Sequence, residues 1–548
     1  MSNNINHKNR WMPIIIAISI IGGIIIGTFF ANRFAGNRLN IINTSSNKLN
    51  DLLHIIDDQY VDTVDIAGIV EQSMPKILEA LDPHSAYISA KDAKTANDDL
   101  KGSFSGIGVQ FVIREDTVRI TGIIKGGPSE KVGLLAGDKI VSIDDKPYVG
   151  KEVTNEETMH RLKGDKGTNV KVGVLRHGHD KPLTFSVTRG DIPLKSVDAT
   201  YMLTNNLGYV KIKNFGETTY PELLTAFAEL ESEGFQGLVI DLRGNLGGYM
   251  AVAIQMVNEF LPKDRLIVYT QGRKSRREEY RSDGRGSYQH LPLIVLIDET
   301  SASASEIFAG AIQDNDRGIV VGRRSFGKGL VQYPVEFSDG SRINLTIARY
   351  YTPAGRCIQK PYVKGQPEEY EMDLITRYER GEFFSQDSIH QTGEEYYTSI
   401  GRVVYGGGGI MPDIFIPEDT IGFTSYYMAV ANQGLIQKFA ISVADEYREK
   451  LKGERTIQRF EEILPGNQQL LEEFVAFAVK NGVPARWYYI NKSRDLIISQ
   501  VKAMIARDVL GYPAFIELLN EDDNVVVKAL YELREGNSPV NILPPESD

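Results

Sequence analysis

Residues 237–248 read GLVIDLRGNLGG, and this stretch indicates the fold of the central part of the chain. Its first six residues are apolar apart from one aspartate and do not alternate with polar residues, which is typical of a strand covered on both faces. The glycines that follow indicate a loop. Helix-like and strand-like segments continue in turn on both sides, and this alternation predicts an α/β domain with a largely parallel sheet over residues 191–419.

A cluster of serines follows a later apolar strand of the same domain. Ser301, Ser303 and Ser305 stand at the expected start of a helix, before Glu306. Free backbone N–H groups and the positive end of the helix dipole lie at such a position, so a serine there has the surroundings of a nucleophile with an oxyanion hole. The spacing from Ser303 to Glu306 also fits a capping box, which only stabilises a helix start. The serine motif alone leaves both interpretations open.

Lys328 lies in the segment GRRSFGKG, residues 322–329. Its glycines and lysine are spaced as in a phosphate-binding loop, but that loop ends in Ser or Thr, where this chain has Gly329, and leads into a helix, whereas the next residues here are strand-like. We therefore expect no bound nucleotide. A lysine can instead act as the base for a serine when burial lowers its pKa from about 10.4 toward neutrality. A parallel crossover can bring Lys328 to the same sheet edge as Ser303.

Composition excludes several classes of protein. The 548 residues carry a formal net charge of −11 and 42% hydrophobic residues, which argue against a dedicated nucleic-acid binder and against wholesale disorder. The single cysteine, Cys357, excludes an intrachain disulfide framework and a multi-cysteine zinc site. The sequence has no H-E-x-x-H motif and no G-x-S-x-G motif with a histidine partner, so we expect neither a metal nor a Ser-His-Asp triad. No cofactor is expected.

The flanking regions differ from the α/β part. Residues 12–31, MPIIIAISIIGGIIIGTFFA, hold no charge and are long enough to span about 30 Å of hydrocarbon as a helix. We interpret them as an uncleaved anchor; the alternative is a cleaved signal peptide, whose apolar core is usually about 7–15 residues. Residues 36–96 are helix-like, and Asp82-Pro83-His84 marks a stop. Residues 97–190 predict a small β-rich domain, and residues 420–548 are helix-rich.

These motifs together resemble the C-terminal processing peptidases, or tail-specific proteases, which are serine proteases with a Ser-Lys dyad and an embedded PDZ domain. The similarity covers roughly residues 40–420 and keeps the family order of motifs. It is carried by SGIGVQF, GGPSEKVGLLAGDKIVSIDDK, GYVKIKNF, GLVIDLRGNLGG, DETSASASEIFAGAIQD, GRRSFGKGLVQ, RYYTPAGRCIQ and GGGGIMPD. The residue patterns and the resemblance together predict a multidomain α/β protein with five parts: a tail and transmembrane helix (1–35), a helical segment (36–96), a PDZ domain (97–190), a crotonase- or Clp-protease-like catalytic domain (191–419), and a helical C-terminal domain with a disordered tail (420–548).

The resemblance also implies roles for catalytic residues. The first serine of SASE, Ser303, corresponds to the nucleophile, and the lysine of SFGKG, Lys328, to the general base. Gln332, four residues later, corresponds to the partner that holds the lysine amine. The oxyanion hole of such an enzyme would use the backbone N–H groups of Ala304 and of Gly247 in the GNLGG loop.

In the PDZ part, the resemblance implies a groove that adds a peptide as an extra strand and binds its terminal carboxylate. Gly106-Ile107-Gly108 fits the carboxylate loop, with Phe104 and Ile107 as walls of the apolar pocket. An ordinary β-turn with buried apolar neighbours is the alternative. Lys163 stands where relatives often carry arginine, and a lysine would couple peptide docking to the active site less rigidly because it lacks the planar fork.

We therefore expect a membrane-anchored serine endopeptidase that cleaves proteins near their free C-termini. The resemblance places it in the bacterial inner membrane as a single-pass protein whose body faces the periplasm, and its helical segments suggest a homodimer or a higher homo-oligomer. The expected partners are peptides and, through residues 12–31, the lipid bilayer, but no nucleic acid. Two alternatives are a non-catalytic PDZ scaffold, against which the intact Ser303, Lys328 and Gln332 argue, and an acyl-CoA-processing enzyme, which has no use for a PDZ domain.

Overall fold

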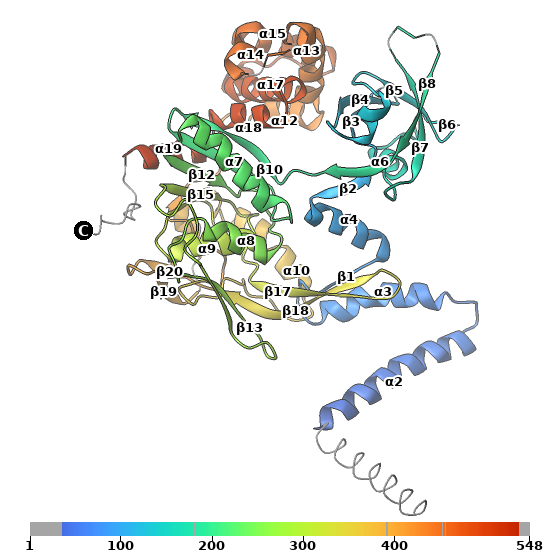
Figure 1. The fold of residues 1–548 in the computed structure, drawn as a ribbon, viewed down its shortest axis with the longest axis vertical. Coiled ribbons are helices and arrows are strands. Elements are labelled where there is room, and N and C mark those ends of the chain that lie inside the picture. Colours follow the sequence, from blue (N-terminus) through green and yellow to red (C-terminus); the bar gives the residue numbers. More distant parts are fainter. Residues whose placement is uncertain are drawn as a thin grey trace, which may run out of the picture. The chain divides into compact units, whose positions relative to one another are not determined.

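The computed structural model describes residues 36–114, 116–176, 178–179, 181–390, 393–451, 453–454 and 456–535 (Figure 1). The segments predicted as a transmembrane anchor and as a disordered tail lie outside these residues. Within the described ranges, no helix combines the length and hydropathy that a membrane span requires. The chain divides into two compact units, Met1–Ile77 and Leu78–Asp548, which we describe separately.

The first unit holds helix α2 (Gly36–Gln59) and most of α3 (Ile66–Glu79). The apolar residues Leu49, Leu52 and Ile55 of α2 are each about half exposed. The helix prediction for this region is correct up to the Pro83 stop. Beyond it the chain forms strand β1 (Ala86–Ile88) and then helix α4 (Ala90–Lys101), which crosses the expected boundary at residue 97. These three residues form a strand in place of the expected helix because they pair with strand β18 (Arg342–Tyr351).

The α/β part is built on a six-stranded sheet whose core strands are parallel, as predicted. In spatial order its strands are β10 (Val197–Thr204), β11 (Leu207–Ile212), β12 (Gly237–Asp241), β15 (Leu293–Ile297), β16 (Ile319–Gly322) and β21 (Ile414–Phe415). Only β10 runs antiparallel to its neighbour. β12 and β15 are fully buried, in accord with their unbroken apolar sequences.

Helices cover both faces of this sheet. One face packs on α7 (Thr219–Glu233), α8 (Met250–Asn258) and α9 (Ala304–Asp314), which are grouped in Figure 1. The other face packs on the last helices of the chain, α18 (Tyr512–Asn520) and α19 (Asn524–Glu535). The helices α18 and α19 therefore pack on the core of the α/β part.

A second, largely antiparallel sheet carries the lysine motif. It contains β1, β13 (Leu266–Gln271), β14 (Glu278–Arg281), β17 (Leu330–Glu336) and β18 (Arg342–Tyr351). β18 pairs with both β1 and β17, so the chain that precedes β1 lies close to the strand that follows Lys328. The chain between β18 and β21 forms α10 (Pro367–Glu371), α11 (Asp373–Glu379), a 3-10 turn (Gln386–Ser388), β19 (Glu395–Tyr397) and β20 (Val403–Tyr405).

The β-rich domain has its own apolar core. Its elements are β3 (Val109–Arg114), β4 (Thr117–Ile123), α5 (Pro128–Val132), β5 (Lys139–Ile143), β6 (Lys146–Pro147), α6 (Asn155–Leu162), β7 (Asn169–Leu175) and β8 (Leu183–Thr188). The strands β2 (Ser103–Gly106) and β9 (Gly190–Pro193) pair where the chain enters and leaves the domain.

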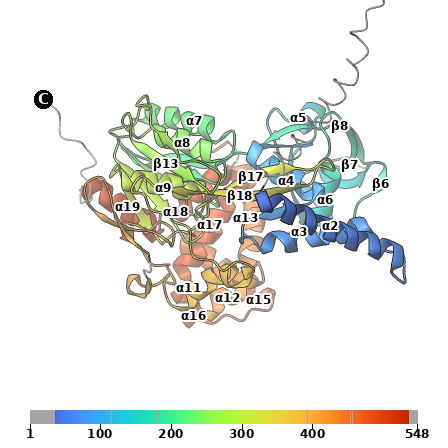
Figure 2. The ribbon, with the colours of Figure 1, turned by 90° about the horizontal axis from the view of Figure 1, so that it is seen from below.

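The C-terminal region is helical and has a separate core, as expected. It comprises α12 (Ser425–Asn432), α13 (Leu435–Leu451), α14 (Ile457–Ile463), α15 (Asn467–Lys480), α16 (Trp487–Lys492) and α17 (Arg494–Val509), followed by α18 and α19. α13 and α17 lie side by side, as the view in Figure 2 shows.

Candidate active site

Ser303 lies on a sharp turn between the buried strand β15 and helix α9. Its backbone has φ 56° and ψ −113°, a conformation that side-chain-bearing residues rarely adopt. Such strain costs about 1–3 kcal/mol and persists only where the surroundings enforce it. A turn of this kind places Ser303 at the end of a parallel strand and at the start of a helix, where the sequence predicts it.

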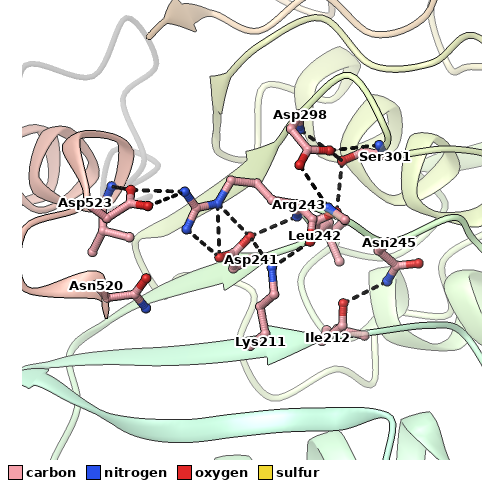
Figure 3. A network of polar contacts seen from close by, with 12 residues as sticks. Lys211, Ile212, Asp241, Leu242, Arg243, Asn245, Asp298, Ser301, Asn520 and Asp523 are labelled. Atoms are coloured by element: carbon pink, nitrogen blue, oxygen red, sulfur yellow. Dashed lines mark hydrogen bonds and ion pairs between the residues drawn. The ribbon is translucent and has the colours of Figure 1, made fainter. Parts of the chain in front are cut away.

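Hydrogen bonds from the neighbouring serines fasten this turn to the GNLGG loop. The Ser301 hydroxyl donates to the carbonyl of Leu242 at 2.9 Å, and the Ser305 hydroxyl donates to the carbonyl of Asn245 at 2.9 Å. The carboxylate of Asp298 accepts the N–H groups of Gly244 and Ser301, each at 3.0 Å, and so holds both segments (Figure 3). These two serines thus act in packing, and Ser303 alone of the three is left as a nucleophile candidate.

Glu306 connects the serine turn to the lysine segment. Its carboxylate accepts the N–H of Ser303 at 2.8 Å, which is one half of the capping box. The same carboxylate accepts the hydroxyl of Ser325 at 2.6 Å and the N–H groups of Gly327 at 2.7 Å and Lys328 at 2.9 Å. Burial raises the pKa of Glu306, and these donors oppose that shift. The sequence predicts Glu306 only as part of a helix cap, because no local pattern reveals the donors from the second segment.

The Lys328 amine is buried and bonded to Gln332. Nζ donates to Oε1 of Gln332 at 3.1 Å, which is the pairing that the sequence predicts. Burial lowers the pKa of Lys328, against the smaller opposing effects of the Glu306 and Asp82 charges. The Tyr350 hydroxyl lies 2.5 Å from the Lys328 carbonyl oxygen and 3.1 Å from that of Ser303, so it joins the two segments again.

The turn that precedes β1 contributes residues that sequence reasoning missed. Gln332 donates its amide hydrogen to the carbonyl of His84, and the His84 ring is hydrogen-bonded to the Tyr370 hydroxyl at 2.7 Å. Burial, with the Lys328 charge second, lowers the pKa of His84 to about 4. Asp82 accepts the N–H groups of His84 and Ser85 at 2.9 and 2.8 Å. The proline stop signal marked this turn, but not its contact with the lysine segment.

The structure brings both predicted oxyanion residues to the serine. Ala304 is the first residue of α9. Gly247 has φ 105°, and a Cβ added there would lie 2.7 Å from the Ser303 Cβ, so only glycine fits this approach. The Gly247 N–H, however, donates to Oδ1 of Asn245 at 2.9 Å. The Nδ2 group of Asn245 donates to the Ile212 carbonyl oxygen and so orients the amide. The Gly247 N–H therefore already has a hydrogen-bond partner in this structure.

The predicted peptide-binding residues lie at the edge of the β-rich domain. Gly106 ends strand β2, and Gly108 has φ 77° in the turn that follows. Ile107 is only 2% exposed and belongs to the domain core, so its side chain is not an open pocket wall. The amine of Lys163 lies 4.5 Å from the centre of the Phe104 ring, an attractive cation–π distance.

Comparison with known proteins identifies three segments. The model of peptidase family S41 matches residues 206–368, the model of the PDZ domain matches residues 105–188, and the model of a family of unknown function matches residues 426–511. The PDZ, α/β and helical C-terminal parts expected from the sequence therefore agree with these matches and with the fold.

Curated relatives extend these matches. The carboxy-terminal-processing protease of Bartonella bacilliformis is 36% identical over 318 residues, which are 57% of this chain and 72% of that protein. The carboxy-terminal processing protease CtpA of Bacillus subtilis is 32% identical over 348 residues, 63% of this chain and 73% of that protein. A solved photosystem II D1 C-terminal processing protease is 24% identical, covers 67% of this chain and 92% of its own, and gives a TM-score of 0.34. On the evidence of its relatives, this chain belongs to the carboxy-terminal processing serine proteases of peptidase family S41.

Proposed function

We propose that Ser303 is the nucleophile of this protease, that Lys328 is its general base, and that Gln332 orients the lysine amine. The Glu306 carboxylate carries this proposal, because it accepts the N–H groups of both Ser303 and Lys328 and so joins the two segments at one buried point. Residues from two distant parts of the sequence are held together there, next to a lysine whose pKa burial lowers.

The chemistry follows from these positions. The Ser303 oxygen attacks the peptide carbonyl and forms a C–O bond while its proton passes to the Lys328 amine. The ammonium then donates that proton to the leaving nitrogen, and the C–N bond breaks to give an acyl-enzyme. Water, deprotonated by the same amine, hydrolyses the ester. Hydrogen bonds of catalytic groups often tighten only when substrate is bound, as we propose for Ser303 and Lys328.

The negative oxygen of the tetrahedral intermediate needs N–H donors. We assign the N–H of Ala304 at the start of α9 to this role, with the helix dipole in support. The Gly247 N–H is the second donor, and it becomes available when substrate displaces it from the Asn245 oxygen. Removal of one such donor typically lowers kcat by about 10²–10³-fold.

Substrate capture is assigned to the PDZ domain. A free C-terminus adds to the domain as an extra strand, and the N–H groups of Gly106-Ile107-Gly108 bind its carboxylate. Phe104 borders the pocket for the last side chain, and the Lys163 amine over its ring links the groove to the end of α6. The protease then cleaves near the bound end of the protein.

The location and assembly are proposed on separate grounds. Residues 12–31 anchor the chain in the bacterial inner membrane by a single span, with the catalytic body in the periplasm; the uncharged run of 20 residues supports this. A homodimer or higher homo-oligomer is supported by Leu49, Leu52 and Ile55 of α2, whose apolar side chains are about half exposed among the residues that the structure describes.

Labelling with a fluorophosphonate tests the catalytic assignment. The full chain in detergent should become tagged, whereas Ser303→Ala and Lys328→Ala should lose both tagging and peptide cleavage. Cys357→Ala is the matched control, since this lone thiol lies outside the proposed chemistry, and it should be tagged at the wild-type rate. Cleavage that persists in Ser303→Ala would overturn the proposal.

A further inference from the structure

The C-terminal helices reach the loop that borders Ser303. Arg243, the residue before GNLGG, has a side chain that is only 16% exposed and bonds to one carboxylate nearby in the sequence and to one far away. Its Nε and Nη2 bind Asp241 at 2.7–3.1 Å, and its Nη1 binds both oxygens of Asp523 at 3.0 and 2.8 Å (Figure 3). Asp523 lies between α18 and α19, in a part of the chain for which the sequence suggests no catalytic motif.

Asp523 is held firmly in its place. Its Oδ1 accepts the N–H groups of Val525 and Val526, each at 2.9 Å, so the carboxylate caps the start of α19. Val525, Val526 and Ala529 of this helix are buried against the central sheet. The bonds to the backbone at the start of α19 therefore fix the position of the carboxylate beside Arg243.

The cluster also balances charge inside the fold. Lys211 lies 3.2 Å from Asp241 and donates to the Arg243 carbonyl at 2.6 Å, so two cations face two carboxylates. Burial acts against the charge on Arg243, but Asp241 and Asp523 outweigh it and hold its pKa well above its ordinary value. Neutralising Asp523 leaves one uncompensated positive charge where the GNLGG loop begins.

A short path leads from Arg243 to the nucleophile. Two residues on, the Asn245 carbonyl accepts the Ala302 N–H at 3.0 Å and the Ser305 hydroxyl at 2.9 Å, so it holds the turn on both sides of Ser303. The Asn245 side chain in turn holds the N–H of Gly247. A shift of Arg243 is thus passed to the serine and to its proposed oxyanion donor.

We propose that Asp523 is a positioning residue, through which the C-terminal helices hold the oxyanion loop in its active geometry. This inference rests on Ser303 as the nucleophile. Substrate binding by the PDZ domain does not involve this contact, so the loss of Asp523 should lower kcat and the rate of acylation while KM changes little.

The test compares Asp523→Asn with two variants of the same helix in the full chain. Asn keeps a cap for α19 but not the charge, and we expect kcat and the fluorophosphonate labelling rate to fall about 10-fold or more, with KM within about twofold. Val526→Ala should lower Tm but keep kcat in the folded protein. Asn524→Ala, which loses only a bond to the Pro417 carbonyl, should leave both rates unchanged.

The outcomes separate the inference from the proposed function. Wild-type protein that is not labelled would refute the role of Ser303. Labelling of the wild type with an unchanged kcat in folded Asp523→Asn would overturn the role of Asp523, and so would a loss of kcat in Val526→Ala equal to that in Asp523→Asn. If Asp523→Asn does not fold, Asp523→Ser, which also caps a helix, gives the same comparison.

Discussion

Lys328 and Arg243 are two buried cations whose segments both contact the Ser303 turn, but their partners differ. Arg243 binds two carboxylates directly, and its pKa is held high. The Lys328 amine binds a neutral amide oxygen, so burial dominates and lowers its pKa. A buried cation with matched anions stabilises the loop, whereas one without them can lose its proton and serve as a base.

The substitution Lys328→Arg should have the largest effect, because it makes the cation at this position permanently charged, as Arg243 is. A guanidinium keeps its charge in proteins and cannot accept the serine proton. We expect kcat for a peptide substrate to fall roughly 10⁴-fold or more, as for other base deletions, with KM close to wild type and a lower Tm, because the guanidinium keeps its charge beside the neutral Gln332 amide. Steady-state kinetics and thermal unfolding measure this; cleavage within tenfold of wild type would contradict the role of Lys328.

The substitution Arg243→Ala should lower stability in addition to the loss of kcat that we expect when its contact with Asp523 is removed. It removes the guanidinium from Asp241, whose side chain is 1% exposed, and leaves Lys211 as the cation beside that carboxylate. Breaking a buried pair costs about 3–5 kcal/mol in the free energy of unfolding. Urea unfolding measures this loss. Arg281→Ala is the matched control, because its pair with Glu279 is largely exposed and should be worth less than about 1 kcal/mol. Equal losses in the two variants would show that the buried pair has no special weight.

His84 is a third basic side chain near the site, and burial lowers its pKa as it does that of Lys328. Its pKa is about 4 in the folded protein and 6.5 in an exposed reference, so the unfolded chain binds the proton more tightly. His84 therefore destabilises the fold progressively as pH falls from 6.5 to 4, by about 2 kcal/mol at pH 5. In His84→Phe this part of the acid sensitivity should be absent from urea unfolding curves. His160→Phe, at an exposed site, should retain it.

Asp82→Asn should give the smallest effect. The Asp82 charge raises the pKa of Lys328, and Glu306 and His84 are the other titratable groups around the amine. Removing the charge lowers that pKa, so the acidic limb of the labelling rate should move to lower pH by a fraction of a unit. Asn keeps the shape of the Asp82 side chain. A limb that moves to higher pH would contradict this electrostatic assignment.

Much of the fold and of the site followed from local sequence. Unbroken apolar strands and intervening helices predict the parallel sheet, because burial on both faces requires such residues. Ser303, Lys328 and Gln332 stand in short motifs with recognisable spacing. The β1 strand within the helical lead was missed, since its three residues form a strand only by pairing with β18.

The sequence by itself determined the layers of the fold and the order of its parts, because these depend on patterns within a few turns or strands. The roles proposed for Ser303, Lys328 and Gln332 followed from the family resemblance that their motifs carry. Tertiary structure alone decided which distant groups meet: the Glu306 carboxylate with the Lys328 segment, the His84 carbonyl with Gln332, and Asp523 with Arg243. The physical reason is that hydrogen bonds and charge pairs act over a few ångströms in space, and their partners here are separated by as many as 280 residues along the chain.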